Sequence, residues 1–275
     1  MHRKEARWRC NRSSCRSERS ARHNSIFAGS RLPLSKLRKI LYFWASGTHV
    51  TEAAEHAGLG LKAGGQWYAY ARDICTAEML RRDKKIGGEG HTVEIDETNM
   101  KKKQKYNRGS KYPDFWCFGG VDRTTKLFAK VVYYDRTKPN LSRAIKSYIK
   151  SGTQNMSDQF NSYVTEVQRG RRKGHLYTLE NNKMLAGMQY THQWVNHSQT
   201  FVDPTTGACT NRIEGVWEVK IKARVKSERG MMKTKLPSFL DEWLWRSWYF
   251  DQRKRTRGSA FFNGLVLGIR RKYKV

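Results

Sequence analysis

Three acidic residues have the types and positions that metal-dependent chemistry requires. Asp96 ends the β-prone run VEID, Asp158 ends the run NMSD, and Glu214 lies one turn into a helical stretch. Two carboxylates at strand ends and one on a helix can converge on one side of a sheet. In a strongly basic protein such crowding is costly unless cations hold the carboxylates, and Mg²⁺ prefers carboxylate and phosphate oxygens as ligands.

A site of this kind would act on phosphodiesters. Two divalent ions about 3.5–4 Å apart can activate a water or a 3′-hydroxyl and also stabilise the leaving oxygen. That is the chemistry of strand cleavage and strand transfer. From the spacing alone, three unrelated surface acids are the simpler interpretation.

The elements that must position these acids indicate a mixed α/β domain over residues 91–252. Its pattern is strand, hairpin, helix, strand, helix, strand, helix. The helix that carries Glu214 is expected to begin at Thr210 as its N-cap. The expected helices cover residues 139–152, 159–170, 210–227 and 236–250, and the expected strands include residues 93–96 and 153–158.

The remaining residues divide into three parts. Residues 35–90 show three helical stretches, which fit a helix-turn-helix-like DNA-binding module or a plain three-helix bundle. Residues 1–34 form a basic arm in which Cys10 and Cys15 are candidate Zn²⁺ ligands, although a complete ribbon needs four. Two free thiols are the alternative. Residues 253–275 are expected to be a basic C-terminal tail.

The composition indicates a polyanionic partner. The chain has 275 residues and a formal net charge of +30. Nucleic acid is the leading candidate to relieve this self-repulsion, and a solvated basic surface is the alternative. The basic run at residues 101–111 suits contact with a phosphate backbone, or is a solvated loop. Its candidate DNA-binding residues are Lys101, Lys102, Lys103, Lys105, Arg108 and Lys111.

The sequence also predicts where the protein acts. No apolar run approaches the ~20 residues that a membrane span needs, so no membrane partner is expected. Five dispersed cysteines do not form a disulfide framework. We therefore expect an intracellular protein, in the nucleus if the host is a eukaryote and otherwise in the cytoplasm or nucleoid.

Several segments, in this order, resemble the transposases of the Merlin superfamily and their bacterial insertion-sequence relatives. They are VEIDET, KYNRGSK, WCFGGVDR, MSDQF, VNHSQTFVDPTTGACTNRIEGVW and LPSFLDEWLWR, and the fifth is long and specific. The resemblance covers about residues 8–250. It implies an RNase H-like mixed sheet flanked by helices, with a DDE-type catalytic centre that uses two Mg²⁺ or Mn²⁺ ions.

The resemblance assigns roles residue by residue. Asp96 and Asp158 match the first two metal ligands, and Glu214 matches the third acid. Asn211, three positions before Glu214 on the same helical face, is a second-choice site residue because some bacterial relatives carry Asn in place of the third acid.

A lysine is also expected near this centre. Relatives tend to place one two turns after the third acid, where this chain has Ile221. Lys220 and Lys222 flank that position. Lys222 is preferred because, in an α-helix, the position eight residues after Glu214 points closer to the direction of Glu214 than the position six residues after it. His197 in VNHS is a candidate to approach the centre or a structural residue, and Trp217 is expected in the core.

The implied function is that of a cut-and-paste transposase. Such an enzyme cleaves the inverted-repeat ends of its element and joins them to double-stranded target DNA, and paired ends imply a homodimer or larger assembly. Three departures favour an inactive, transposase-derived DNA-binding protein instead: the missing first Cys pair, about twenty extra residues near 170–189, and the displaced lysine. An RNA-binding protein is a third hypothesis, without the corresponding sequence signatures.

Overall fold

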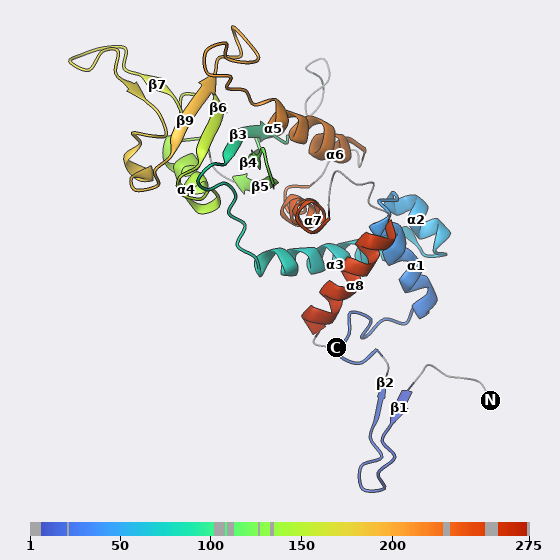
Figure 1. Cartoon of the computed structure of the whole chain (residues 1–275). Helices are drawn as coiled ribbons and strands as arrows, with labels where there is room; N and C mark the ends of the chain where they lie inside the picture. Colours follow the sequence, from blue (N-terminus) through green and yellow to red (C-terminus); the bar gives the residue numbers. More distant parts are fainter. Residues whose placement is uncertain are drawn as a thin grey trace. The chain divides into compact units, whose positions relative to one another are not determined.

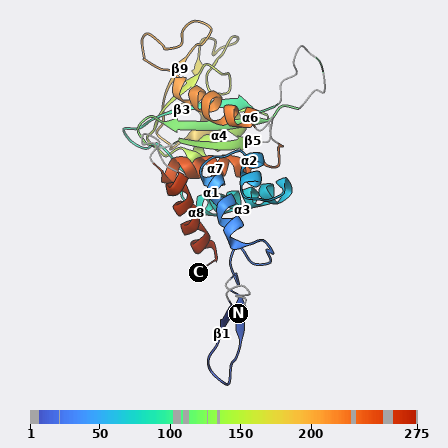
Figure 2. The same ribbon diagram turned by 90° about the vertical axis from the view of Figure 1, so that its right-hand side faces the viewer.

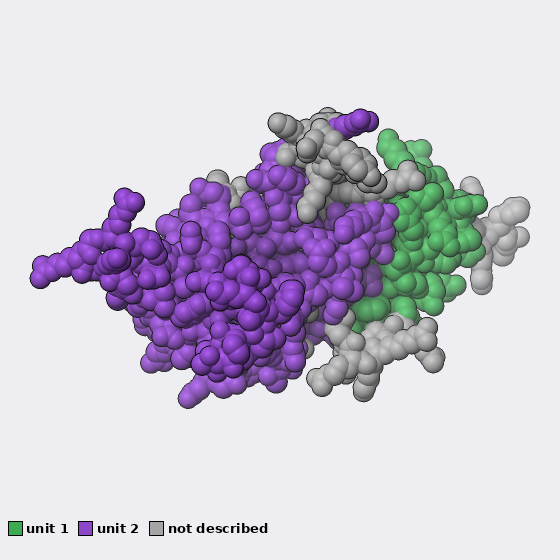
Figure 3. All heavy atoms as spheres, turned by 90° about the horizontal axis from the view of Figure 1, so that it is seen from above, with its two compact units in different colours: residues 1–81, 250–275 green, residues 82–249 purple. Residues whose placement is uncertain are grey.

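The computed structural model describes residues 7–20, 22–101, 108, 113–125, 127–132, 135–227, 232–250 and 258–273. The chain divides into two compact units, which Figure 3 colours separately. Unit 1 comprises residues 1–81 and 250–275, and unit 2 comprises residues 82–249. In the part of the chain that is described, no helix has the length and apolarity needed to cross a membrane.

Unit 1 is a helical module with a small β-hairpin before it. The three helices expected between residues 35 and 85 are all present, and Gly47 and Gly58 follow the first two with positive φ angles of 79° and 62°. The left-handed backbone at these glycines ends each helix without steric cost. The elements are β1 (Arg7–Arg9), β2 (Glu18–Ser20), α1 (Leu34–Ala45), α2 (Val50–His56), α3 (Leu61–Leu80) and α8 (Gly258–Tyr273) (Figure 1).

A glycine sets the close approach of α2 and α3. A Cβ atom added to Gly64 would lie 2.8 Å from the Cβ of Ala54 in α2, which is closer than real Cβ atoms come. Gly65 beside it has no atom within 4 Å of the corresponding position. Of the two glycines near the start of α3, Gly64 is therefore the one that the packing of α2 against α3 requires.

The C-terminal residues fold back onto the helices of unit 1. Within residues 253–275, expected as a basic tail, α8 packs against α1 and α3. The buried carboxylate of Glu78 in α3 connects α3 to α8, because Arg271 of α8 lies 2.7 Å from it. Arg81, at the end of α3, lies 3.0 Å from the same carboxylate. Unit 1 is thus built from both ends of the chain.

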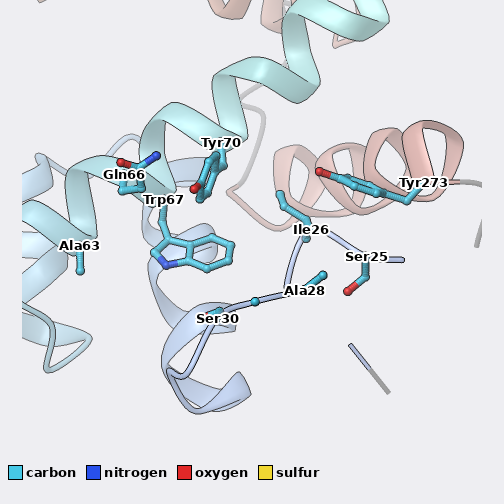
Figure 4. A pocket seen from close by; sticks show the side chains of 10 residues that line it. Ser25, Ile26, Ala28, Ser30, Ala63, Gln66, Trp67, Tyr70 and Tyr273 are labelled. Carbon is cyan, nitrogen blue, oxygen red and sulfur yellow. The ribbon is translucent and has the colours of Figure 1, made fainter. Parts of the chain in front are cut away.

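Unit 1 also contains a cavity of about 490 Å³ (Figure 4). Trp67 and Tyr70 of α3, the loop at residues 25–30 and Tyr273 of α8 line it. None of its lining residues carries a carboxylate, an imidazole or a thiol, so the acid-dependent chemistry expected from the sequence does not belong here.

Unit 2 is built on a five-stranded mixed sheet with the strand order β5-β4-β3-β6-β9 (Figures 1 and 2). β3 is antiparallel to β4 and parallel to β6, which is parallel to β9. This order and these directions are those of an RNase H-like sheet, so the expected fold class is confirmed. The strands are β3 (Thr92–Asn99), β4 (Trp116–Asp122), β5 (Leu127–Val132), β6 (Gln154–Asp158) and β9 (Thr191–Val195).

Helices and short strands surround this sheet. α4 crosses between the antiparallel strands and β6, and the chain after β9 is mainly helical. These elements are α4 (Lys138–Tyr148), β7 (Thr165–Glu166), β8 (Leu176–Tyr177), the 3₁₀ turn η1 (Lys183–Leu185), α5 (Asn211–Gly215), the π-helical segment η2 (Val216–Lys222), α6 (Ala223–Ser227) and α7 (Leu236–Tyr249).

One face of β4 carries a hydrophobic core that fixes the helices after β9. Side chains alternate between the two faces of a strand, and the buried Cys117 and Val121 point to the same face. Trp217 is 2% exposed in this core, as expected. The core consists of Phe115, Cys117, Val121, Ile213, Val216, Trp217, Ile221, Leu236, Phe239 and Leu240.

The expected helix over residues 159–170 is wrong. The chain turns after Phe160, and β7 then pairs with β8 as an antiparallel hairpin. Part of the extra segment near 170–189 is packed into the unit, because Leu179 and Leu185 are buried and Asn182 donates a hydrogen bond to Ser142 of α4.

Candidate active site

The first two predicted acids lie side by side on neighbouring strands. β3 and β6 are parallel, with Glu94 beside Met156. Asp96 and Asp158 each lie two residues further on, so their side chains share one face of the sheet. Gly119 of β4 pairs with Asp96 on its other side and places no side chain next to it.

The charges of these carboxylates are poorly compensated. Burial, followed by the negative charge of Asp158, raises the pKa of Asp96 to about 7, and Glu214 adds to this effect. Burial also raises the pKa of Asp158, while Phe160 N–H, His197 and Arg136 oppose the shift. Repulsion between carboxylates in a desolvated site is characteristic of sites that bind cations or protons.

The helix that carries the third acid is anchored to the strand that carries the first. Glu94 of β3 is fully buried, and its Oε2 accepts hydrogen bonds from the backbone N–H groups of Arg212 and Ile213, at 2.9 and 3.2 Å. Its Oε1 accepts from Nε of Arg123 at 2.8 Å. A carboxylate at a helix N-terminus satisfies free N–H groups and opposes the positive end of the helix dipole.

The sequence-based assignment of the N-cap needs a correction. Thr210 makes no side-chain cap of α5. Its hydroxyl donates instead to Oε1 of Glu214 at 2.7 Å, and the capping role falls to Glu94 from another element. A local motif cannot reveal this cap because its partner lies 118 positions away.

Glu214 belongs to a small polar network. Nε2 of His197 lies 2.7 Å from the Thr210 hydroxyl and 3.1 Å from Oε1 of Glu214. Because the Thr210 hydroxyl gives its single proton to Glu214, Nε2 of His197 acts as the donor to that hydroxyl. His197, weighed above as a candidate or a structural residue, therefore helps to hold the third acid.

A π-helical segment explains why Lys222 and not Ile221 faces the acids. A segment with i→i+5 hydrogen bonds holds more residues per turn than an α-helix, so the residues after it shift by about one position around the axis. Ile221 is fully buried in the core, whereas the charge of Lys222 acts on both Asp96 and Cys117. Lys222 also bonds Glu218 at 2.5 Å.

The other predicted DNA-site residues contribute less to this geometry. Asn211 is exposed at the first residue of α5, and its side chain forms no hydrogen bond with the described residues. Arg108 is exposed, and Lys101 pairs with Asp114 at 2.6 Å. Lys102, Lys103, Lys105 and Lys111 lie outside the described residues.

Cys10 and Cys15 meet on the hairpin of unit 1. The hydroxyl and N–H of Ser17 lower the pKa of Cys15, and the thiol of Cys10 adds to the effect. Both are free thiols. No third His, Cys, Asp or Glu joins them within the described ranges, so these residues do not make up a four-ligand Zn²⁺ site there.

Three residues of the site were missed by the sequence analysis. They are Glu94 and Glu97, both within β3, and Arg136, which lies in the chain between β5 and α4. The side chains of Glu94 and Glu97 are 0% and 3% exposed. The available signal was the presence of acids inside a strand, at positions where the burial pattern calls for apolar residues.

The donor set fits a divalent cation in its chemistry. Carboxylate oxygens are the ligands that Mg²⁺ and Mn²⁺ prefer, and a cation would relieve the repulsion that raises the pKa of Asp96. The buried Oε1 of Glu97 has no hydrogen-bond partner. Among the described residues, no three His, Cys, Asp or Glu side chains lie close enough together to hold one metal ion.

Comparison with known proteins places the fold in context. No family model matches the chain, and no curated protein sequence matches it. Among solved structures, a pre-cleavage Mos1 transpososome matches with 8% identity and a TM-score of 0.30, over 89% of this chain and 78% of that one. A Mos1 mariner paired-end complex with Mn matches with 10% identity, a TM-score of 0.30 and the same coverage. Likenesses of this size do not transfer residue roles or activity.

Proposed function

We propose that this chain is a DNA transposase of the DDE type that cleaves and transfers DNA strands with divalent metal ions. One observation carries the proposal: two carboxylates on adjacent parallel strands repel each other in a desolvated site, and the strand that holds the first also anchors the helix of a third acid. The resemblance of the motifs to Merlin-superfamily transposases points to the same chemistry.

The proposed roles follow from the positions of the side chains. Asp96 and Asp158 would hold Mg²⁺ or Mn²⁺, and Glu214 would complete the set. Bound metal would polarise the phosphodiester and activate a water or a 3′-hydroxyl. His197 and Thr210 orient Glu214 through their hydrogen bonds.

The basic surface supports DNA as the substrate. Lys222 brings a positive charge next to Asp96, where it would oppose the charge of a phosphate group. The net charge of +30 favours binding to the duplex backbone. In this proposal unit 1 recognises the inverted repeats, a homodimer or larger assembly pairs the two ends, and the protein acts in the nucleus of a eukaryotic host.

A nicking assay tests the proposal. The substrate is a duplex that carries the inverted repeats expected on either side of the coding sequence, and it is incubated with purified protein and Mg²⁺ or Mn²⁺. We expect metal-dependent strand cleavage that Asp96→Asn lowers by about 1,000-fold, since losing a metal ligand removes several kcal/mol of transition-state stabilisation. Asp73→Asn, at an exposed position in unit 1, is the matched control. Full cleavage by Asp96→Asn would refute the assignment.

A second candidate is a DNA-binding protein that has lost catalysis. It is favoured by the spacing of the acids, because no three potential ligands within the described residues surround one ion, and by the bonds that tie Glu214 to His197 and Thr210. Calorimetric titration with Mg²⁺ and Mn²⁺ separates the two. An enzyme binds the metal and loses binding in Asp96→Asn, whereas an inactive relative shows neither effect while still binding the duplex.

A further inference from the structure

The charge of Arg136 acts on Asp158, and its guanidinium has an unusual set of neighbours. Its guanidinium carbon is 3.5 Å from the centre of the Trp116 ring and 4.5 Å from the centre of the Phe160 ring. A guanidinium over an aromatic ring is attracted to it and keeps its N–H edges available. Trp116 begins β4 and Phe160 follows the second acid, so this arginine is held by the site's own elements.

The backbone also holds Arg136 in place. The hydroxyl of Ser162 donates a hydrogen bond to the Arg136 carbonyl at 2.7 Å. Phe160, which contacts the guanidinium, donates its N–H to Oδ1 of Asp158 at 3.2 Å. One short turn therefore positions both the second acid and the ring that holds the arginine.

Toward the described residues, the N–H donors of Arg136 form no hydrogen bond. Its side chain is 31% exposed, and its nearest acid is Oε2 of Glu97, at 3.8 Å from Nη1. That distance is longer than the donor–acceptor distance of an N–H···O hydrogen bond, which is about 2.7–3.2 Å. An arginine that is fixed by stacking but unbonded at its edges is preorganised for an anion with two acceptor oxygens.

The surroundings favour a phosphate over a carboxylate as that anion. Asp158 and Glu97 both feel the charge of Arg136, yet neither forms a close pair with it. Any polyanion is drawn to a protein with a net charge of +30, and a DNA strand adds to this a regular row of phosphates, one at every nucleotide. A phosphodiester also offers two non-bridging oxygens to one guanidinium.

We propose that Arg136 binds a backbone phosphate of the DNA at the Asp158 side of the carboxylate site and so positions the strand for cleavage. The inference rests on the proposed function, because it takes DNA as the substrate of that site. Lys222, whose charge acts on Asp96, is a separate candidate for phosphate contact.

Chemical modification tests this contact without requiring cleavage. The wild-type protein is treated with phenylglyoxal, alone and with a 30-base-pair duplex of arbitrary sequence in Ca²⁺ buffer, and the modified arginines are identified by peptide mass spectrometry. We expect the duplex to slow modification of Arg136 by about ten-fold, the factor that corresponds to one charge-assisted hydrogen-bond pair. Exposed Arg143 of α4 is the internal reference. Equal modification of Arg136 with and without bound duplex would overturn the proposal.

Single-phosphate substitution gives a second, independent test. Duplexes with the inverted repeats carry one neutral methylphosphonate at successive positions around the cut site, and their affinities are measured for the wild type, Arg136→Gln and Arg143→Gln. One position should weaken the wild type by about ten-fold and leave Arg136→Gln unchanged, while Arg143→Gln still responds.

The two proposals fail in different ways. If neither variant loses its response at any position, Arg136 makes no phosphate contact, even if the nicking assay succeeds. If Arg136 is protected and coupled to one phosphate but the wild type never cleaves, the phosphate contact stands and the catalytic function fails. Circular dichroism of Arg136→Gln shows whether the variant is folded, and the modification experiment on the wild type does not depend on it.

Discussion

Removing the carboxylate of Glu94 should release the helix of the third acid. In Glu94→Ala, the N–H groups of Arg212 and Ile213 lose their acceptor, and Arg123 loses its 2.8 Å ion pair. Breaking a buried charged pair by removing one partner costs about 3–5 kcal/mol. Glu94→Gln keeps one acceptor oxygen and the size of the side chain, so about 1.5–3 kcal/mol, the contribution of a charged hydrogen bond, is expected.

The effect can be measured globally and locally. For a unit of this size about 2–4 °C of Tm corresponds to 1 kcal/mol, so Glu94→Ala should melt about 6–20 °C lower. Hydrogen exchange followed by mass spectrometry should show faster exchange in peptides that cover residues 210–216. Glu166→Ala, an exposed acid of β7, is the matched control and should change neither property.

A specific result would refute this reasoning. That result is a Tm of Glu94→Ala within about 1 °C of the wild-type Tm, together with exchange of residues 210–216 at the wild-type rate. Glu94 would then not anchor α5. The position of Glu214 would then depend on the hydrophobic core alone.

Three further changes test other parts of the structure. Gly64→Ala should destabilise unit 1 by about 1–3 kcal/mol, because its Cβ would meet that of Ala54 at 2.8 Å. Gly65→Ala has free space and should stabilise unit 1 by up to about 1 kcal/mol. Urea unfolding measures both changes, and equal effects would contradict this packing. In metal-free protein, the pKa of about 7 for Asp96 means that the folded state keeps a proton that the unfolded chain releases near pH 4. The free energy of unfolding should therefore fall between about pH 4 and 7, by up to about 4 kcal/mol, and Asp96→Asn should remove that part of the decline; parallel pH profiles of the two proteins count against it. Glu78→Gln should free α8 by removing the charge that pairs with its arginine, which faster tryptic cleavage within residues 258–273 would report and an unchanged rate would contradict.

Local patterns predicted the elements whose stability is local. The apolar spacing of α1 and α3 and the glycines after α1 and α2 marked the helices of unit 1 correctly. The β-prone run Val93–Asp96 predicted the strand of Asp96, whereas the mainly polar segment 153–158 was interpreted only as strand-like. Their pairing across the parallel β3–β6 contact joins residues about 60 positions apart, and only the motif resemblance connected them.

The wrong helix at residues 159–170 shows where local patterns fail. Phe160, Tyr163, Val164 and Val167 recur at helical spacing. In the structure Tyr163 and Val164 are buried within a turn, and Val167 bonds to His175 across the hairpin. The same apolar spacing fits a turn followed by a strand when the next strand along the chain, β8, supplies the pairing partner.

The missed site residues have a similar physical cause. Glu94 and Arg136 gain their roles from partners on other elements, at Arg212 of α5 and at Trp116 of β4. An isolated acid within a strand and an isolated arginine before a helix carry no periodic signal. Burial of the acid identifies Glu94 only after the register of the sheet is known.

The π-helical turn between Val216 and Lys222 affects how this chain should be compared with others. A one-residue insertion is normally assigned to a loop, and alignment methods penalise it within a helix. Here an ungapped alignment from Glu214 onward would set Ile221 opposite the lysine of the transposases that the motifs resemble, and would suggest that a basic group had been lost. Allowing one gap inside the helix restores Lys222 to that column and makes the apparent substitution a change of helical winding.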